Sequence, residues 1–596
     1  MTKIVKIFIL LSVLFLSEKK VEGRGINGGI SCAACTIVSG ISGQLAVLHN
    51  ETFFNESLRL CQMLPGALRA YCDSIVQTLE PIFTDSELMK TFTPDIFCYA
   101  IGICYAEKSF CYLFPKPPGN FYLNIQDFKM AAHVAYKQRN SSLVDVNEKL
   151  ASFKFDICKL PGFSVICDTF NKSYTTLQPS VDFDGDYFSI YEAARGSHWR
   201  GRDCADWNDN IYPGRLPVSE DIHKDSNCNG IFGTNPDTGE AYETELCNGT
   251  VSRGVIYLGD SVGAHFHMPE AWFNPRLISS VAWSLGLSMP MSGIEPRTLN
   301  SVERQATNLT CSLALLVSSD QGHTDSIYWK LRSRNRCNHR DYQNLSQNGA
   351  SSEDLPRYLK TVSRNQTTDK PALVFYGMFG NDVCNRFPDT TSKMTTPDMF
   401  RKNVVQVLES LEAILPAGSH VVLIGLVDGG LIYPVMADRL HPIAHLGYIS
   451  SLYNVPGQVG NNVYYRDVYN WFNCMEIGPC VGWMNTNATL RKITSRAAQK
   501  LSSVLQDIVA EEKFRSFDLN YLDNPFHEVI YRWQQRGGPA WELIDPVDSL
   551  HPAQDAQPLI ANILWEHINE KFPHVLGDVN PNNDEIQQVF GDQQGH

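Results

Sequence analysis

The run Val255-Ile256-Tyr257-Leu258-Gly259-Asp260-Ser261-Val262-Gly263 decides the fold of this chain. Its first four residues are apolar and predict a buried strand, and the glycines that follow predict a tight turn. A serine on such a turn is exposed at the edge of a sheet, where its hydroxyl can act as a nucleophile. Near the other end of the chain, Asp548-Ser549-Leu550-His551 supplies a carboxylate and an imidazole three residues apart. Together the two runs indicate a serine esterase.

From about residue 251 to the end, the chain alternates strand and helix patterns. The runs at 255–258, 372–376, 420–426 and 517–521 are predicted to be strands. Thr396-Pro397-Asp398 predicts a helix start, because it supplies a cap, a proline at the first position and an acid in the first turn. This alternation predicts an α/β fold, with helices flanking a parallel sheet and with functional sites beyond the carboxyl ends of the strands. We assign residues 251–596 to this domain.

Length and composition limit the remaining possibilities. A chain of 596 residues is too long for one ordinary core, so two or more domains are expected. The formal charge of −14 argues against nucleic acid as a partner and against steady attraction to anionic lipid. The 17 cysteines indicate an oxidising compartment, and their odd number leaves a thiol that is free or that bridges to another chain.

The N-terminus and the glycosylation motifs also indicate secretion. Lys3 and Lys6 precede an apolar run at 7–16, which is shorter than the about 20 residues needed to span a bilayer. Residues 1–24 are therefore interpreted as a signal peptide with a possible propeptide, and the protein is expected to be secreted or held in secretory or lysosomal vesicles. Glycosylation sequons that fit this route lie at Asn50, Asn55, Asn140, Asn171, Asn248, Asn308, Asn365 and Asn487.

Residues 27–112 form a cysteine-rich segment with apolar positions at helical spacing. Its cysteines are Cys32, Cys35, Cys61, Cys72, Cys98 and Cys104. A small helical domain of this kind cannot bury all of its apolar surface, and the surface left over marks a lipid or partner site. Residues 113–157 then form a polar, proline-containing linker with an expected processing site. Cys111 lies outside the set of six, and after cleavage the two pieces would stay joined only through a disulfide.

An acidic insertion is predicted at 158–250. Carboxylates and amides alternate in three runs, at 182–186, 203–209 and 221–229, and oxygen donors at this spacing beside a glycine are what a calcium loop requires. No glutamate stands at the twelfth position, so this is not a full EF-hand, and Glu243 or Glu245 is expected to close the shell. Cys204 and Cys228 would pin the loops. The predicted ligands of a structural calcium ion are Asp182, Asp184, Asp186, Asp203, Asp206, Asn208, Asp221, Asp225, Asn227, Asn229 and Glu243, with backbone carbonyls of Phe188 and Ile231. The alternative is a set of solvated acidic turns.

Two further runs offer donors for an oxyanion. Asn344-Leu345-Ser346-Gln347-Asn348-Gly349-Ala350 puts a glycine in a loop, where its backbone N–H can approach a ligand closely. Gly380-Asn381-Asp382 follows the strand at 372–376, so the Asn381 amide is expected at the same sheet edge as Ser261.

These four runs, in this order, resemble the GDSL or SGNH hydrolase family, although Val262 and Gly263 depart from the family's usual Ser-Leu. The resemblance implies that Ser261 is the nucleophile, His551 the base and Asp548 the acid that orients it. It also implies an oxyanion hole made by the backbone N–H groups of Ser261 and Gly349 and by the Asn381 side chain. Asn344 forms a sequon inside the second run, and we expect it to be unoccupied because a glycan would crowd the site.

The six-cysteine segment resembles a saposin B-type domain. The resemblance implies the pairs Cys32–Cys104, Cys35–Cys98 and Cys61–Cys72, and a role in binding membranes or extracting lipids. The alternative is a disulfide-stabilised domain with no lipid role. Cys474 and Cys480 are expected to pair with each other or with distant cysteines.

The combination of both domains resembles the acyloxyacyl hydrolase family. The likeness spans nearly the whole chain and includes His198-Trp199-Arg200-Gly201-Arg202-Asp203-Cys204 and Cys337-Asn338-His339-Arg340-Asp341-Tyr342-Gln343-Asn344. That family removes the fatty acyl chains esterified to other acyl chains in the lipid A of lipopolysaccharide, and it is cut into small and large subunits joined by a disulfide. The resemblance therefore implies an enzyme that detoxifies endotoxin and that meets lipopolysaccharide, other acylated lipids and lipid surfaces. The alternatives are a broader secreted phospholipase or lysophospholipase and a lipid carrier without catalysis.

Overall fold

The computed structural model describes residues 25–62, 93–100, 103–106, 110–115, 178–179, 181–191, 200–264, 326–446, 462–553 and 555–594, with Arg69, Asp73, Val76, Gln77, Glu80, Phe266 and Phe273. The predicted signal peptide and most of the predicted linker lie outside the described residues. So do Cys72 and the sequons at Asn140, Asn171 and Asn308.

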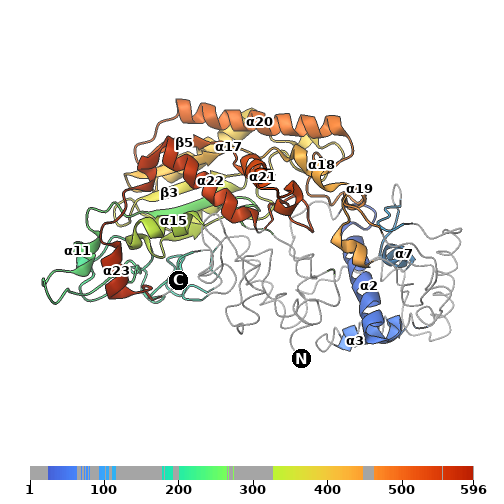
Figure 1. Ribbon diagram of the computed structural model, residues 1–596, viewed down its shortest axis with the longest axis horizontal. Helices are drawn as coiled ribbons and strands as arrows, with labels where there is room; N and C mark the ends of the chain where they lie inside the picture. Colours follow the sequence, from blue (N-terminus) through green and yellow to red (C-terminus); the bar gives the residue numbers. More distant parts are fainter. Residues whose placement is uncertain are drawn as a thin grey trace.

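A parallel five-stranded sheet forms the centre of the C-terminal domain (Figure 1). Its strands are β1 (Gly254–Gly259), β2 (Tyr342–Asn344), β3 (Ala372–Gly377), β4 (Ser419–Ile424) and β5 (Phe517–Leu522). They lie in the order β2-β1-β3-β4-β5, so the loops after β1 and β3 diverge at a switch point, where ligands bind in open α/β sheets. The predicted α/β fold is confirmed. β2 was not predicted.

Helices cover both faces of the sheet, which explains why β1 and β3 are buried along their full length. α17 (Pro397–Glu412) packs against α20 (Ala488–Glu511), and α15 (Ile327–Arg334) packs against α22 (Ala556–Lys571). α17 begins where the sequence predicts, and the Thr396 hydroxyl accepts a hydrogen bond from the Met399 N–H. The other helices and 3-10 turns of the region after residue 200 are η2 (Ser219–Asp221), α11 (Tyr242–Cys247), η5 (Arg336–Asn338), α16 (Leu355–Tyr358), η6 (Leu359–Thr361), η7 (Thr391–Lys393), η8 (Gly429–Leu431), α18 (Ile432–Met436), η9 (Pro442–Leu446), α19 (Tyr465–Cys474), α21 (Phe526–Gln535), η11 (Ala540–Leu543), η12 (Pro573–Leu576) and α23 (Asn583–Phe590).

The N-terminal domain is helical, as predicted. Its described helices are α2 (Gly29–His49), α3 (Phe53–Gln62) and α7 (Pro94–Ala100). The disulfides Cys32–Cys104 and Cys35–Cys98 tie α2 to the end of the domain, and Cys61 is also disulfide-bonded. Among the described residues, α2 alone is long and apolar enough to cross a membrane by length and composition. Half of its apolar window is buried, however, so α2 serves here as the core helix of a disulfide-stabilised domain.

The helical domain and the sheet domain share a hydrophobic core. Phe97 and Cys98 of the helical domain belong to the same buried cluster as Trp471 of α19. The disulfide Cys111–Cys474 joins the two domains at this place, which lies near the end of α19 in Figure 1. Cys480 pairs with Cys384, so the alternative of a local Cys474–Cys480 disulfide is wrong. Both cysteines are instead bonded to residues that are distant in the sequence, Cys474 to Cys111 and Cys480 to Cys384.

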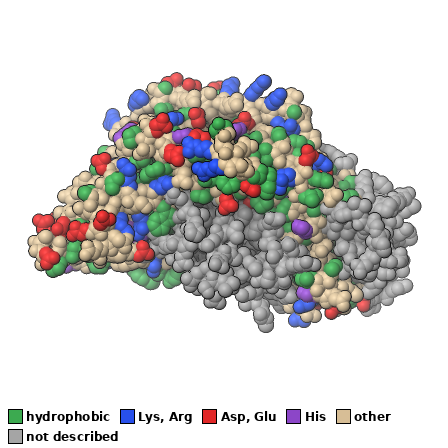
Figure 2. Space-filling model, viewed as in Figure 1, with side chains coloured by type: hydrophobic (Ala, Val, Ile, Leu, Met, Phe, Trp, Pro, Cys, Tyr) green, Lys and Arg blue, Asp and Glu red, His purple; other side chains and the backbone are tan. Residues whose placement is uncertain are grey.

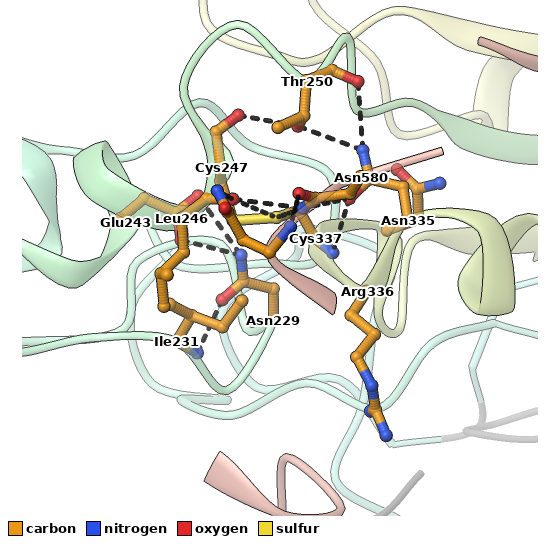
Figure 3. The surroundings of a disulfide bond; sticks show 12 residues. Asn229, Ile231, Glu243, Leu246, Cys247, Thr250, Asn335, Arg336, Cys337 and Asn580 are labelled. Atoms are coloured by element: carbon orange, nitrogen blue, oxygen red, sulfur yellow. Dashed lines mark hydrogen bonds between the residues drawn. A yellow bond between two sulfur atoms is a disulfide. The ribbon is translucent and has the colours of Figure 1, made fainter. Parts of the chain in front are cut away.

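The acidic insertion lies along the β2 edge of the sheet. Arg200 donates to the Gln343 side chain on β2 (2.9 Å), and the Gly201 N–H donates to the Tyr342 carbonyl (2.9 Å). A disulfide also attaches the insertion to the sheet domain. It is Cys247–Cys337, which joins the end of α11 to η5 (Figure 3). A second disulfide of the insertion, Cys204–Cys228, joins two of the acidic loops, and these are the two cysteines that the sequence analysis expects to pin them.

Candidate functional site

Ser261 lies on the turn that follows β1, and this turn is held by the residue before it. The Asp260 carboxylate is 1% exposed and accepts hydrogen bonds from the backbone N–H groups of Val262 (3.0 Å), Phe379 (2.7 Å) and Gly380 (3.2 Å). Burial raises the pKa of Asp260 to about 6, although the three N–H groups oppose this shift. Sequence reasoning gave Asp260 no role, because its partners after β3 are more than 100 residues away.

The glycine that departs from the family pattern is explained by close packing. A β-carbon on Gly263 would lie 2.3 Å from both Ser346 Oγ and Tyr257 Cε1. The Gly263 carbonyl also accepts a hydrogen bond from the Asn344 side chain (2.8 Å). Asn344 is 3% exposed, so its side chain supports the nucleophile turn and is shielded from glycan transfer in the folded protein.

Ser261, His551 and Asp548 form a continuous hydrogen-bonded chain. His551 Nε2 lies 2.7 Å from Ser261 Oγ, and His551 Nδ1 lies 2.8 Å from Asp548 Oδ2. Burial alone would raise the pKa of Asp548 and lower the pKa of His551. Their mutual attraction outweighs burial, so the pKa of Asp548 is lowered and the pKa of His551 is raised. This arrangement can withdraw a proton from the serine hydroxyl and hold the resulting imidazolium.

A compact loop at 545–551 presents the acid and the imidazole. Asp545 Oδ1 accepts hydrogen bonds from the N–H groups of Val547 (2.8 Å) and Asp548 (2.9 Å), and the Asp545 N–H donates to the His551 carbonyl (2.9 Å). Asp548 Oδ1 accepts from the N–H groups of Leu550 and His551. The Phe266 ring also contacts the His551 ring, with centroids 4.7 Å apart. The loop therefore fixes both side chains from its own backbone.

The two predicted oxyanion loops lie next to each other. Gly349 is exposed at a φ of +77°, and a β-carbon there would meet no atom of the described residues within 4 Å. Asn381 Nδ2 donates to the carbonyl of the adjacent Ala350 (3.0 Å), which leaves its second N–H unused by this bond. Asp382 binds the Ser352 N–H (3.0 Å) and hydroxyl (2.6 Å), and so ties the loop after β3 to the loop after β2.

A cleft of about 690 Å³, open solvent included, lies beside these groups. Ser261, His551 and Asn381 line it, and Gly349 does not. Its walls are mostly apolar, and they come from the loop after β4, from Trp483 and from Phe526. Such walls suit an acyl chain better than a polar substrate. The wall residues were not predicted, because apolar residues that line a cleft have the same pattern as core residues.

The acidic loops at 182–186 and 203–209 bring predicted metal ligands together. Asp182, Asp184 and Asp206 offer oxygen atoms within 4.8 Å of one another, and so do Asp184, Asp186 and Asp203. A calcium ion holds its ligands at 2.3–2.6 Å, so this spread fits one ion per group. Asp186 Oδ2, Asp203 Oδ2 and Asp206 Oδ2 are buried and have no hydrogen-bond partner among the described residues. Burial, assisted by the neighbouring carboxylates, raises the pKa of Asp186 to about 8 and the pKa of Asp203 to about 7.

Two other predicted ligands, Asn208 and Phe188, donate backbone hydrogen bonds to the carboxylates of these loops. The Asn208 N–H donates to Asp184 Oδ2 (2.7 Å), and the Phe188 N–H donates to Asp186 Oδ1 (2.8 Å). Both residues therefore lie beside the carboxylates, and their roles as calcium ligands stay predictions.

The later acidic loop gathers around Glu243, which lies near Asn229 and Ile231 in Figure 3. The side-chain amides of Asn227 and Asn229 donate to the Glu243 carboxylate (3.0 and 2.9 Å). Asp225 is buried beside them, and burial raises its pKa to about 7. Glu245 bonds to Asn235 instead, so Glu243 is the one of the two glutamates that faces this loop.

Two further predicted ligands of the later loop are used by the turn itself. Asp221 accepts from the Ser226 N–H (3.0 Å) and the Val218 N–H (3.1 Å). The Ile231 N–H donates to Asn229 Oδ1 (2.7 Å).

The described sequons, other than Asn344, are at exposed positions. These are Asn50, Asn55, Asn248, Asn365 and Asn487.

Comparison with known proteins places both domains. The sequence matches the family described as GDSL-like Lipase/Acylhydrolase over residues 255–564 and the family described as Saposin-like domain over residues 31–168. It is 40% identical over 605 residues to the acyloxyacyl hydrolase of Mus musculus, covering 100% of this chain and 99% of that protein. This chain belongs to the acyloxyacyl hydrolase family. The acyloxyacyl hydrolase of Homo sapiens is 37% identical over 601 residues, covering 99% of this chain and 98% of that protein.

Membership of the acyloxyacyl hydrolase family establishes the broad activity. The chain is a hydrolase, a lipid esterase in which a saposin-like domain precedes a GDSL domain. Both domains belong to classes that interact with lipids.

Proposed function

We propose that this enzyme releases the fatty acyl chains esterified to hydroxyls of other acyl chains in the lipid A of lipopolysaccharide. The observation that carries the proposal is the hydrogen-bonded chain Ser261–His551–Asp548 beside an apolar cleft. The substrate itself is taken from the family resemblance. Removal of these chains would detoxify endotoxin.

The reaction would proceed through an acyl-enzyme. His551 accepts the Ser261 proton as Ser261 Oγ attacks the ester carbonyl, and Asp548 holds the imidazolium. The oxyanion receives hydrogen bonds from the Ser261 and Gly349 N–H groups and from the Asn381 side chain. His551 then gives its proton to the departing hydroxyl oxygen of the lipid. Water then enters and attacks the acyl carbonyl as His551 accepts its proton, and the fatty acid leaves as His551 returns that proton to Ser261 Oγ.

The saposin-like domain would supply the acyl chain. An ester inside a lipid aggregate is not accessible to a water-facing serine, and an apolar helical module attached to the hydrolase domain would lower the free energy of drawing the chain out. The shared core and the Cys111–Cys474 disulfide keep that module next to the hydrolase domain. If the chain is secreted and cut in the 113–157 linker, as predicted, this disulfide would join the small and large subunits.

The acidic loops would hold structural calcium. Buried carboxylate oxygens without partners fit a cation, and acidic side chains gather over the end of the molecule that carries α11 (Figure 2). Asp182, Asp184, Asp186, Asp203 and Asp206 would hold ions in the first loops, and Asp225 and Glu243 would contribute to a further one. Bound calcium supplies positive charge that offsets carboxylate repulsion, and no step of the reaction requires it.

The proposal is tested by incubating the purified protein with lipopolysaccharide and identifying the released acids by mass spectrometry. We expect release of the acyloxyacyl-linked chains, with the primary chains retained, and no release by Ser261→Ala. A protein that cleaves glycerophospholipids at a higher kcat/KM than lipid A would instead be the broader phospholipase. Turnover by Ser261→Ala equal to that of the wild type would refute the nucleophile assignment.

A further inference from the structure

A buried histidine outside the proposed triad contacts the loop at 545–551, which we call the acid–base loop. His441 Nδ1 accepts a hydrogen bond from the Ile443 N–H (3.0 Å), so the proton is on Nε2, which donates to the Val547 carbonyl (2.7 Å). The Tyr465 hydroxyl donates to the neighbouring Pro546 carbonyl. Two consecutive carbonyls just before Asp548 are therefore fixed by side chains from a distant segment.

The segment that contains His441 also packs against the helical domain. His441 directly precedes η9, and η9 packs against α2. At this contact a β-carbon on Gly40 of α2 would lie 2.7 Å from Leu446 Cβ and 3.0 Å from the Leu446 carbonyl oxygen. Only a residue without a side chain allows this close approach.

Val547 completes the connection. Its side chain is 5% exposed and belongs to the core cluster that contains cysteines of the helical domain and residues of α19. Figure 1 shows α19 at the boundary between the sheet domain and the helices α2 and α7. A continuous series of contacts thus runs from α2 through η9 and His441 to Val547, the residue that precedes Asp548.

We propose that His441 is a positioning residue through which the docked helical domain sets the geometry of Asp548 and His551. The domain then supports turnover itself in addition to lipid binding. The inference rests on the proposed roles of Asp548 as acid and His551 as base. A displacement of about 1 Å at such groups can lower the rate by roughly 100-fold, so a contact remote from the reacting atoms is sufficient.

A soluble short-chain ester separates this role from lipid capture, because it needs no extraction from an aggregate. With p-nitrophenyl butyrate and the full-length protein, we expect His441→Phe to lower kcat by roughly 10- to 100-fold while KM changes little. His441→Gln offers a side-chain N–H to the Val547 carbonyl and should recover part of the loss. An unchanged kcat in His441→Phe would overturn the proposal.

A variant in the helical domain keeps the test independent of the histidine. Gly40→Ala introduces the β-carbon that would push η9 away from α2, and we expect a lower kcat on the same soluble ester. The matched control is Val47→Ala on the same helix, where the side chain is 42% exposed. Equal kcat values for wild type, Gly40→Ala and Val47→Ala would show that the helical domain does not act on the acid–base loop.

The pH profile distinguishes positioning from loss of folded protein. The fields of Asp548, Asp545 and Asp260 raise the pKa of His551 against the effect of burial. A misplaced Asp548 weakens this effect, so the acidic limb of kcat/KM should move to lower pH in His441→Phe and in Gly40→Ala. A smaller folded fraction would reduce the amplitude without moving the limb, and that result would contradict the proposal.

The outcome with Ser261→Ala keeps this inference separate from the proposed function. Hydrolysis of the soluble ester by Ser261→Ala would refute the nucleophile assignment. An inactive Ser261→Ala together with normal His441→Phe and Gly40→Ala variants would refute only the positioning role.

Discussion

The proposed active site and the acidic insertion both bury carboxylates, but they satisfy them differently. Asp548 receives hydrogen bonds from His551 and from two backbone N–H groups, and Asp260 receives three from the backbone. In the insertion, one oxygen each of Asp186, Asp203 and Asp206 is buried and finds no partner within the part of the chain that the structure describes. A buried charge without compensation is unstable. Asp548 is therefore satisfied by groups of the protein itself, whereas the buried oxygens of the insertion support the proposed bound cation.

The largest expected effect on activity comes from breaking the ion pair between Asp548 and His551. Asp548→Asn keeps the shape of the side chain but removes the charge that holds the His551 tautomer. We expect kcat to fall by roughly 10⁴-fold, as in other serine hydrolases with this substitution. Release of fatty acid from lipid A by the variant, measured by mass spectrometry, gives the value. Residual activity above about one tenth of wild type would mean that Asp548 is not the orienting acid.

Removal of calcium should destabilise the acidic insertion and leave Ser261, His551 and Asp548 in place. In a chelator, repulsion among the acidic-loop carboxylates is no longer offset, and we expect stability to fall by about 3–4 kcal/mol relative to saturating calcium. The measurement is the Tm by calorimetry with chelator and with calcium restored.

A matched pair of variants sharpens the calcium test. Asp203→Asn should reduce the calcium-dependent rise in Tm, and Asp209→Asn, at an exposed acid of the same loop, should not. The same Tm with chelator and with calcium would contradict a structural ion.

The buried His441 should make the stability of the folded protein depend on pH. Burial lowers the pKa of His441 to about 4 in the folded protein, against about 6.5 when unfolded. The unfolded chain therefore binds more protons between these values, and this group's contribution is present above pH 6.5 and lost as the pH falls to 4. Its full size is roughly 3 kcal/mol. Denaturant titrations from pH 7 to 4 should show a shallower loss in His441→Gln, and an equal loss in both proteins would be inconsistent with a buried neutral His441.

The smallest effect is expected at the support of the nucleophile turn. Asp260→Asn keeps an oxygen acceptor but weakens the bonds from the Val262, Phe379 and Gly380 N–H groups. We expect a loss of about 1–3 kcal/mol in the free energy of unfolding, with kcat reduced less than in Asp548→Asn. Urea titration and ester turnover measure the two quantities. A larger kcat loss than in Asp548→Asn would assign Asp260 a direct role in the chemistry.

The sequence predicts the parts of this molecule that depend on local patterns. Four of the strands in this sheet are predicted from short runs of the sequence, and the start of α17 is predicted from its cap residues. β2 was missed because it has only three residues, and its Gln343 is a buried polar side chain that pairs with Arg200. A short polar strand has no periodic signal.

The same limit applies to the site. The triad residues stand in recognisable runs, but Asp260 and His441 act on backbone groups of Phe379 and Val547, and no spacing encodes such pairs. Likewise the partner of Cys111 is 363 residues away, and sequence alone does not choose among possible cysteine pairings.

The central claim is that His551 activates Ser261 as a nucleophile. The most direct measurement is the rate of modification by a fluorophosphonate, with the modified residue located by peptide mass spectrometry. The account predicts a single adduct on Ser261 in the wild type and a greatly slowed reaction in His551→Gln. An adduct on another residue, or an equal rate in His551→Gln, would contradict it.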